Sequence, residues 1–212
     1  MKSLSGAVGL LERALGYTIG SLTAVTPEAL SRPTPCPDWD LRALLHHLAD
    51  SLAALYEAID DGHVTIDVSD ANSGRLDEAA GLVVLIRDRA RRVLGFWACE
   101  SDGDGDGDGD GHGDGDGHGD GDRLIAVGDR PMRADMMACV GAIEIAVHGW
   151  DVYQACGPPR PIPPALAADL LELAPAFVTD AERPSRFAAP VPTSPTASDG
   201  ERLVAFLGRD PT

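Results

Sequence analysis

The chain contains 212 residues, of which 44% are hydrophobic, and its 34 acidic and 17 basic side chains give a formal charge of −17. This acidity argues against binding to nucleic acid, which depends on lysine and arginine side chains that neutralise phosphates. No apolar run approaches the ~18 residues of a membrane span, and the first 15 residues lack the pattern of a signal peptide. We therefore expect a cytoplasmic protein that binds neither nucleic acid nor a membrane, and we interpret its four cysteines, which form no CxxC pair, as free thiols.

Apolar residues recur every three or four positions in the first half of the chain, which predicts three amphipathic helices. The first covers residues 4–22 and ends or kinks at Thr26-Pro27. Three prolines within residues 33–37 then exclude regular structure, and Asp38 is the expected N-cap of the second helix, residues 41–59. A third helix, with a single apolar stripe, is expected over residues 76–97.

Asp and Gly alternate through residues 102–122, with two histidines in place of aspartates. The spacing does not fit an EF-hand loop, which needs acidic residues at positions one, three and five, Gly at six and Glu at twelve. We interpret the tract as a flexible, self-repelling linker inserted between the third and fourth helices. Weak cation binding is the alternative.

The second half of the chain is also mainly helical in pattern. Residues 124–127 predict a strand or an extended loop, and a fourth helix begins near Arg133, has its apolar stripe centred on Val140, and ends at Gly157. A helix at 164–177, a proline-rich loop at 183–198 and a last turn or two at 201–207 follow. These elements predict an all-α protein: a four-helix bundle over residues 1–157, with a helical, proline-rich C-terminal extension, residues 158–212, packing on it.

The fourth helix carries the clearest chemical signal, Glu144-Ile-Ala-Val-His148-Gly-Trp-Asp151. Glu144 and His148 are four residues apart and point from one face. With Val140 at the centre of the stripe, Glu144 falls about 40° and Asp151 about 20° away, inside the face that should be buried. An unpaired ionised carboxylate there is very costly. It needs a metal, an arginine, a histidine or a proton, and a metal fits best because His148 supplies a second type of ligand.

Other residues that could join such a site are less clearly marked. His46 and His47 of the second helix fall about 140° and 120° to opposite sides of its apolar stripe, and the periodicity does not choose between them. Cys36 lies close in sequence to the start of the second helix, and Cys139 lies on the fourth helix near the edge of its apolar stripe. Either could line a pocket. Buried, inert thiols are the commoner case.

Three blocks of the sequence resemble the mycothiol-dependent maleylpyruvate isomerase-like, DinB-like metal-binding family of actinobacteria. They are Thr34-Pro-Cys-Pro-Asp-Trp-Asp-Leu-Arg-Ala-Leu-Leu-His-His47-Leu, the Glu144–Asp151 block, and Arg202-Leu-Val-Ala-Phe-Leu-Gly-Arg-Asp-Pro211. The third block resembles the ending of a short, single-domain branch of that family. The blocks occur in the family's order and span most of the chain.

The resemblance implies a divalent metal at one end of the bundle, held by one histidine of the second helix and the Glu-x-x-x-His pair of the fourth. Carried over by motif position, the metal ligands are His47, Glu144 and His148, so the resemblance selects His47 over His46. Asp151 becomes a candidate hydrogen-bond partner of a ligating histidine. Two imidazoles and one carboxylate leave an open position on zinc, and nickel or iron is also compatible with these ligands.

The resemblance also implies a low-molecular-weight thiol, mycothiol, as cosubstrate, whose thiolate would add to a small electrophile in isomerisation or S-transfer. A non-catalytic metal-binding or stress-related module is one alternative, and a bundle whose histidines are only structural is another. The isomerase itself carries a further C-terminal domain of different fold, whereas only about 50 residues follow Gly157 here. We therefore do not expect maleylpyruvate isomerase activity.

Overall fold

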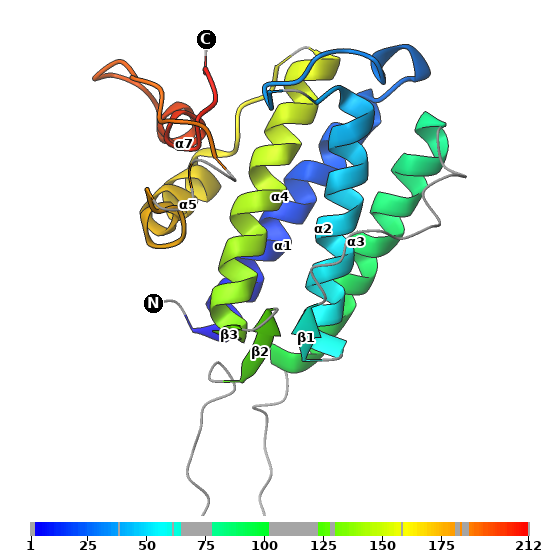
Figure 1. Cartoon of the computed structure of the whole chain (residues 1–212), viewed down its shortest axis with the longest axis vertical. Coiled ribbons are helices and arrows are strands. Elements are labelled where there is room, and N and C mark those ends of the chain that lie inside the picture. Colours follow the sequence, from blue (N-terminus) through cyan, green and yellow to red (C-terminus); the bar gives the residue numbers. More distant parts are fainter. Residues whose placement is uncertain are drawn as a thin grey trace, which may run out of the picture.

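Four long helices form the body of the protein in a computed structural model. The structure describes residues 3–37, 39–60, 62–64, 78–101, 123–127, 130–157, 159–180, 183 and 187–211. The helices are α1 (Leu4–Ser21), α2 (Leu41–Asp60), α3 (Ala79–Ser101) and α4 (Ala134–Cys156). Helices α1 and α4 run in one direction and α2 and α3 in the other (Figure 1). The predicted all-α class and four-helix bundle are therefore confirmed.

Helix α4 lies at the centre of the molecule, packed against α1, α2 and the C-terminal helix α5 (Pro164–Phe177). Because it has neighbours on several sides, 19 of its 23 residues are buried. The prediction of a single apolar stripe centred on Val140 is wrong for this helix, and Val140 itself is only half-buried. Glycine and alanine occur throughout α4, and small side chains allow other helices to approach it closely.

A small three-stranded sheet lies at one end of the bundle (Figure 1). Strand β2 (Leu124–Val127) is central, parallel to β1 (His63–Val64) and antiparallel to β3 (Arg130–Arg133). The extended run at 124–127 is thus confirmed as a strand. The partners β1 and β3 were not expected, because strands of two and four residues are too short to show a period of two.

The proline-rich segment before α2 folds into a tight turn, from which Cys36 and Trp39 pack against the bundle. The Thr34 hydroxyl donates to the Trp39 carbonyl at 3.0 Å and accepts from the Cys36 N–H at 3.2 Å. Asp40 caps α2, since its carboxylate accepts the Ala43 N–H at 2.9 Å. The expected cap, Asp38, lies outside the described residues.

The C-terminal residues form α5 and α7 (Asp199–Phe206), with irregular chain over the described residues 187–198 between them. Helix α5 packs on α1 and α4, and α7 packs on α5. Both helices were predicted, but the division of the chain after residue 157 remains a prediction. The Asp-Gly tract, residues 102–122, lies outside the described residues. Among the helices that are described, none is long and apolar enough to cross a membrane.

Candidate metal centre

Three side chains from two helices meet at one carboxylate oxygen. His47 reaches from α2, and Glu144 and His148 come from adjacent turns of α4. The Nε2 atom of His47 lies 2.7 Å, and that of His148 3.1 Å, from Oε1 of Glu144. The three donor atoms all lie within 4.8 Å of one another. The structure therefore brings the three predicted ligands together, whereas His46 is not part of this group.

The Glu144 carboxyl is ionised despite its position between helices. Burial alone would raise its pKa, but the positive charge on His148 and hydrogen bonds from both histidines outweigh burial and hold the pKa well below its usual range. Its side chain is 31% exposed, so one side of the cluster opens toward solvent. The cluster thus combines a negative charge with partial exposure to solvent.

His148 is oriented by carboxylates on both sides of its ring. Its Nδ1 atom lies 3.0 Å from Oδ2 of Asp151, a fully buried carboxylate one turn further along α4. Burial would lower the pKa of His148, yet the Glu144 charge and the hydrogen bonds to Asp151, Cys36 and Glu144 raise it well above its ordinary value. The Asp151 contact keeps Nδ1 protonated, which leaves Nε2 as the atom that can bind a metal.

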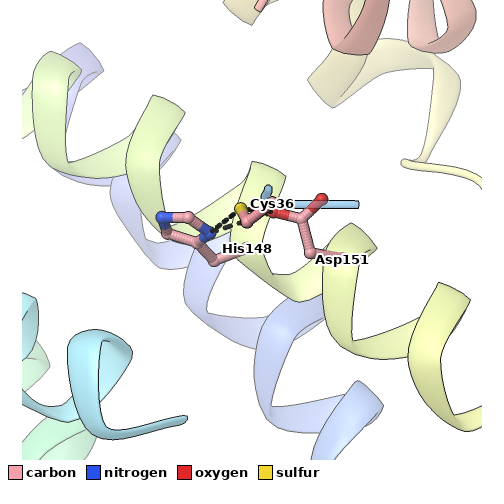
Figure 2. A group of neighbouring side chains, drawn as sticks. All are labelled: Cys36, His148 and Asp151. Carbon is pink, nitrogen blue, oxygen red and sulfur yellow. Dashed lines mark hydrogen bonds and ion pairs between the residues drawn. The ribbon is translucent and has the colours of Figure 1, made fainter. Parts of the chain in front are cut away.

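A second cluster lies on the Nδ1 side of the same histidine. Figure 2 shows Cys36 and Asp151 converging with His148, the cysteine coming from the turn before α2. Cys36 Sγ donates to Asp151 Oδ2 at 3.2 Å and lies 3.9 Å from His148 Nδ1. Arg209, from the chain after α7, donates to Asp151 Oδ2 at 3.0 Å and to Cys36 Sγ at 3.1 Å. Cys36 is half-buried and is hydrogen-bonded to Asp151 and Arg209.

Two further side chains border the cluster of His47, Glu144 and His148. The Trp39 ring lies beside both imidazoles, with its centroid 4.6 Å from that of His47 and 6.1 Å from that of His148. Ser51, one turn after His47 on α2, places its hydroxyl 3.5 Å from His47 Nε2. Trp39 limits the movement of the rings, and Ser51 is a polar group beside the cluster.

The donor atoms of the first cluster fit a divalent metal ion. A tetrahedral zinc with bonds of about 2.0–2.1 Å holds its donor atoms roughly 3.3 Å apart, close to the 2.7 and 3.1 Å separations found here. With neutral imidazoles the cluster carries one negative charge, that of Glu144. The second cluster already has its charge balanced, because Arg209 pairs with Asp151. Of the two clusters, the first therefore has the more negative charge among its described side chains.

Sequence reasoning gave Arg209 and Ser51 no part in the site, and it left Cys36 as either a pocket-lining thiol or a buried, inert one. Ser51 follows His47 by four residues, so helical spacing could have placed them on one face. Arg209 is 58 residues from Asp151 along the chain, and no local pattern links them. The requirement that a buried carboxylate have a partner was the one available signal.

A comparison with protein families agrees with this architecture. The model of the family described as the mycothiol maleylpyruvate isomerase N-terminal domain matches residues 11–118, slightly more than half of the chain. The matched region includes His47 and ends before Glu144 and His148. No curated protein and no solved structure matches the chain. With its DinB-like helical bundle, the chain belongs to the family of the mycothiol maleylpyruvate isomerase N-terminal domain.

Proposed function

We propose that this protein binds one divalent metal ion through His47, Glu144 and His148, and that it transfers a thiol to a small electrophile or isomerises that electrophile. Zinc is the expected metal, and nickel or iron also suits the ligands. Mycothiol is the expected thiol, because the chain belongs to a mycothiol-related family. The observation that carries the proposal is the convergence of two imidazole nitrogens on one ionised carboxylate.

The composition of the cluster favours a reactive centre over a purely structural one. Among the residues that the structure describes, it contains three donor side chains, whereas structural zinc sites are closed by four protein ligands. A bound metal would supply an open position at which a thiol loses its proton more readily. The partial exposure of Glu144 provides access from solvent.

The surrounding residues have separate tasks in this proposal. Asp151 holds the proton on His148 Nδ1 and so fixes the ring with Nε2 directed at the cluster. Trp39 packs beside both imidazoles and limits their movement. The Ser51 hydroxyl lies beside His47, where it can donate a hydrogen bond to an incoming thiol or electrophile.

The first experiment is metal stoichiometry by elemental analysis of untagged protein. It is done on the full chain and on a variant lacking residues 102–122, because the aspartates of that tract can hold cations loosely. We expect one metal ion per chain in both proteins, retained by His46→Ala and lost in His47→Ala and in Glu144→Gln/His148→Ala. His46→Ala is the matched control, since it removes the neighbouring imidazole of the same helix.

Two results would contradict different parts of this proposal, the ligand assignment and the reaction. Unchanged metal content in the Glu144→Gln/His148→Ala variant would refute the ligand assignment. Stoichiometric metal with neither consumption of mycothiol nor mycothiol-dependent isomerisation, across a panel of small electrophiles, would refute the transfer or isomerisation and leave a non-catalytic metal-binding module.

A further inference from the structure

His148 belongs to two donor clusters that lie on opposite sides of its ring. Nε2 faces Glu144 and His47, and Nδ1 faces Asp151 and Cys36 (Figure 2). The donor atoms of each cluster lie within 4.8 Å of one another. By distance alone, either cluster could hold a metal ion, so another feature must decide between them.

Arg209 is that feature. Its side chain is buried, with the residue 8% exposed, and its guanidinium contacts both outer donors of the Nδ1 cluster. It donates to Asp151 through Nη2 at 3.0 Å and through Nε at 3.4 Å, and to Cys36 Sγ through Nη2 at 3.1 Å. These bonds place N–H groups against the donor atoms that a metal would need. The fixed positive charge also repels a second cation at this distance.

Helix α7 and the turn after it fix the position of Arg209. Helix α7 begins with a capping box between Ser198 and Glu201. After the helix, Gly208 has a φ of +85°, and a Cβ at that position would lie 2.7 Å from Ala188, so only glycine fits this turn. The Arg209 N–H then bonds to the Val204 carbonyl at 2.9 Å. The arginine is thus held by backbone contacts as well as by its ion pair.

We propose that Arg209 is a positioning residue that decides which of the two clusters takes the metal. This inference rests on the proposed metal centre, and it identifies Arg209 as the residue that makes that centre selective. Arg209 occupies the Nδ1 cluster, holds Asp151 against His148, and so leaves Nε2 with His47 and Glu144 as the donor set for a cation.

The proposal has a distinctive consequence for protein without the guanidinium. Cys36, His148 Nδ1 and Asp151 would then be donors without a guanidinium on them, separated by 3.0 to 3.9 Å, and a cysteine sulfur is among them. Asp151 would also hold His148 less firmly. Loss of Arg209 should weaken binding at the Nε2 cluster and open a competing site that contains sulfur.

Cobalt(II) tests this, because a cobalt–thiolate bond absorbs in the near ultraviolet and imidazole and carboxylate ligands do not. The full chain is titrated with cobalt(II), with Arg209→Met, Arg209→Met/Cys36→Ser and Arg202→Met prepared in parallel. Arg202→Met is the matched control, since Arg202 is an exposed arginine of α7. We expect no thiolate band for the wild type and Arg202→Met, a band for Arg209→Met, and its loss on adding Cys36→Ser.

Affinity provides the second reading. The Arg209→Met/Cys36→Ser variant, which retains only the Nε2 cluster, should bind cobalt about 10- to 100-fold more weakly than Cys36→Ser alone, the range found when a partner of a metal-ligating histidine is removed. If Arg209→Met does not fold, Arg209→Lys serves instead. It keeps a charge above Asp151 but lacks the two-pronged guanidinium, so it should bind several-fold more weakly than the wild type without a thiolate band.

The outcomes separate this inference from the proposed function. If the Arg209 variants give the same cobalt spectra and affinity as the wild type, the selective role of Arg209 is overturned and the proposed metal centre is unaffected. A thiolate band in the wild type would overturn both. If the wild type binds no cobalt, the proposed function fails. In that case, cobalt binding by Arg209→Met that depends on Cys36 would still support exclusion of the metal by Arg209. An Arg209→Met variant that also binds no cobalt would refute that exclusion.

Discussion

Gly149, the residue after the proposed ligand His148, sets the distance between α1 and α4. A Cβ at this position would lie 2.3 Å from Oγ1 of Thr18 and 3.0 Å from its Cα. Thr18 cannot simply turn away, because its hydroxyl donates to the Ile145 carbonyl at 2.7 Å and its Cα belongs to the α1 backbone. Gly149→Ala therefore forces the two helices apart.

The magnitude follows from three contributions. Overpacking of a well-filled interior costs about 1–3 kcal/mol, and loss of the Thr18 hydrogen bond costs about 1 kcal/mol. The better helix propensity of alanine returns about 1 kcal/mol. We therefore expect a net loss of about 1–3 kcal/mol in the free energy of unfolding, which for a chain of this size lowers the thermal midpoint by roughly 2–12 °C.

Urea and thermal unfolding followed by circular dichroism measure this loss. Gly95→Ala is the matched control, because Gly95 is an exposed glycine of α3 with nothing within 4 Å of its Cβ position, and it should gain up to about 1 kcal/mol. The Gly149→Ala/Thr18→Ala variant lacks the closest clash, which is with Oγ1 of Thr18. Its loss of stability should therefore be smaller than the sum of the losses in the two single variants. A Gly149→Ala variant as stable as the wild type would refute the close approach of these helices.

Three further predictions concern a cap, a buried phenol and the metal. Asp40→Ala removes the acceptor of the Ala43 N–H and should lower stability by about 1 kcal/mol in urea unfolding; an unchanged midpoint would contradict the cap. Burial raises the pKa of Tyr17, whose hydroxyl donates to the Arg160 carbonyl. The wild type should therefore lose stability as the pH rises above about 10, the ordinary tyrosine value, and Tyr17→Phe should lose less between pH of about 9 and 11; equal losses would refute this. Zinc at 100 times its dissociation constant should stabilise the protein by about 2.7 kcal/mol, seen by calorimetry as a higher midpoint that a chelator reverses, and no shift would argue against a metal in the folded state.

Periodicity was sufficient to predict the long helices, because a helix that buries one face repeats its apolar residues every three or four positions. The bounds of α5 agree with the prediction, and α1 and α2 differ from it by about a residue. The bounds of α4 also agree with the prediction, but its single apolar stripe was wrong, because its central position removes the polar face that periodicity detects. Periodicity also missed β1 and β3, whose pairing depends on segments far apart in the chain.

The amino-acid sequence by itself determined the helical class, the Glu144–His148 pair on one helix face, and the need of buried Asp151 for a partner. It did not distinguish His46 from His47 without the family resemblance, because both flank the apolar stripe of α2. Only the tertiary structure brings His47 to Glu144 and carries Arg209, 58 residues beyond Asp151, to that carboxylate. Local spacing determines which side chains share a helix face, whereas contacts between distant segments depend on how the helices pack.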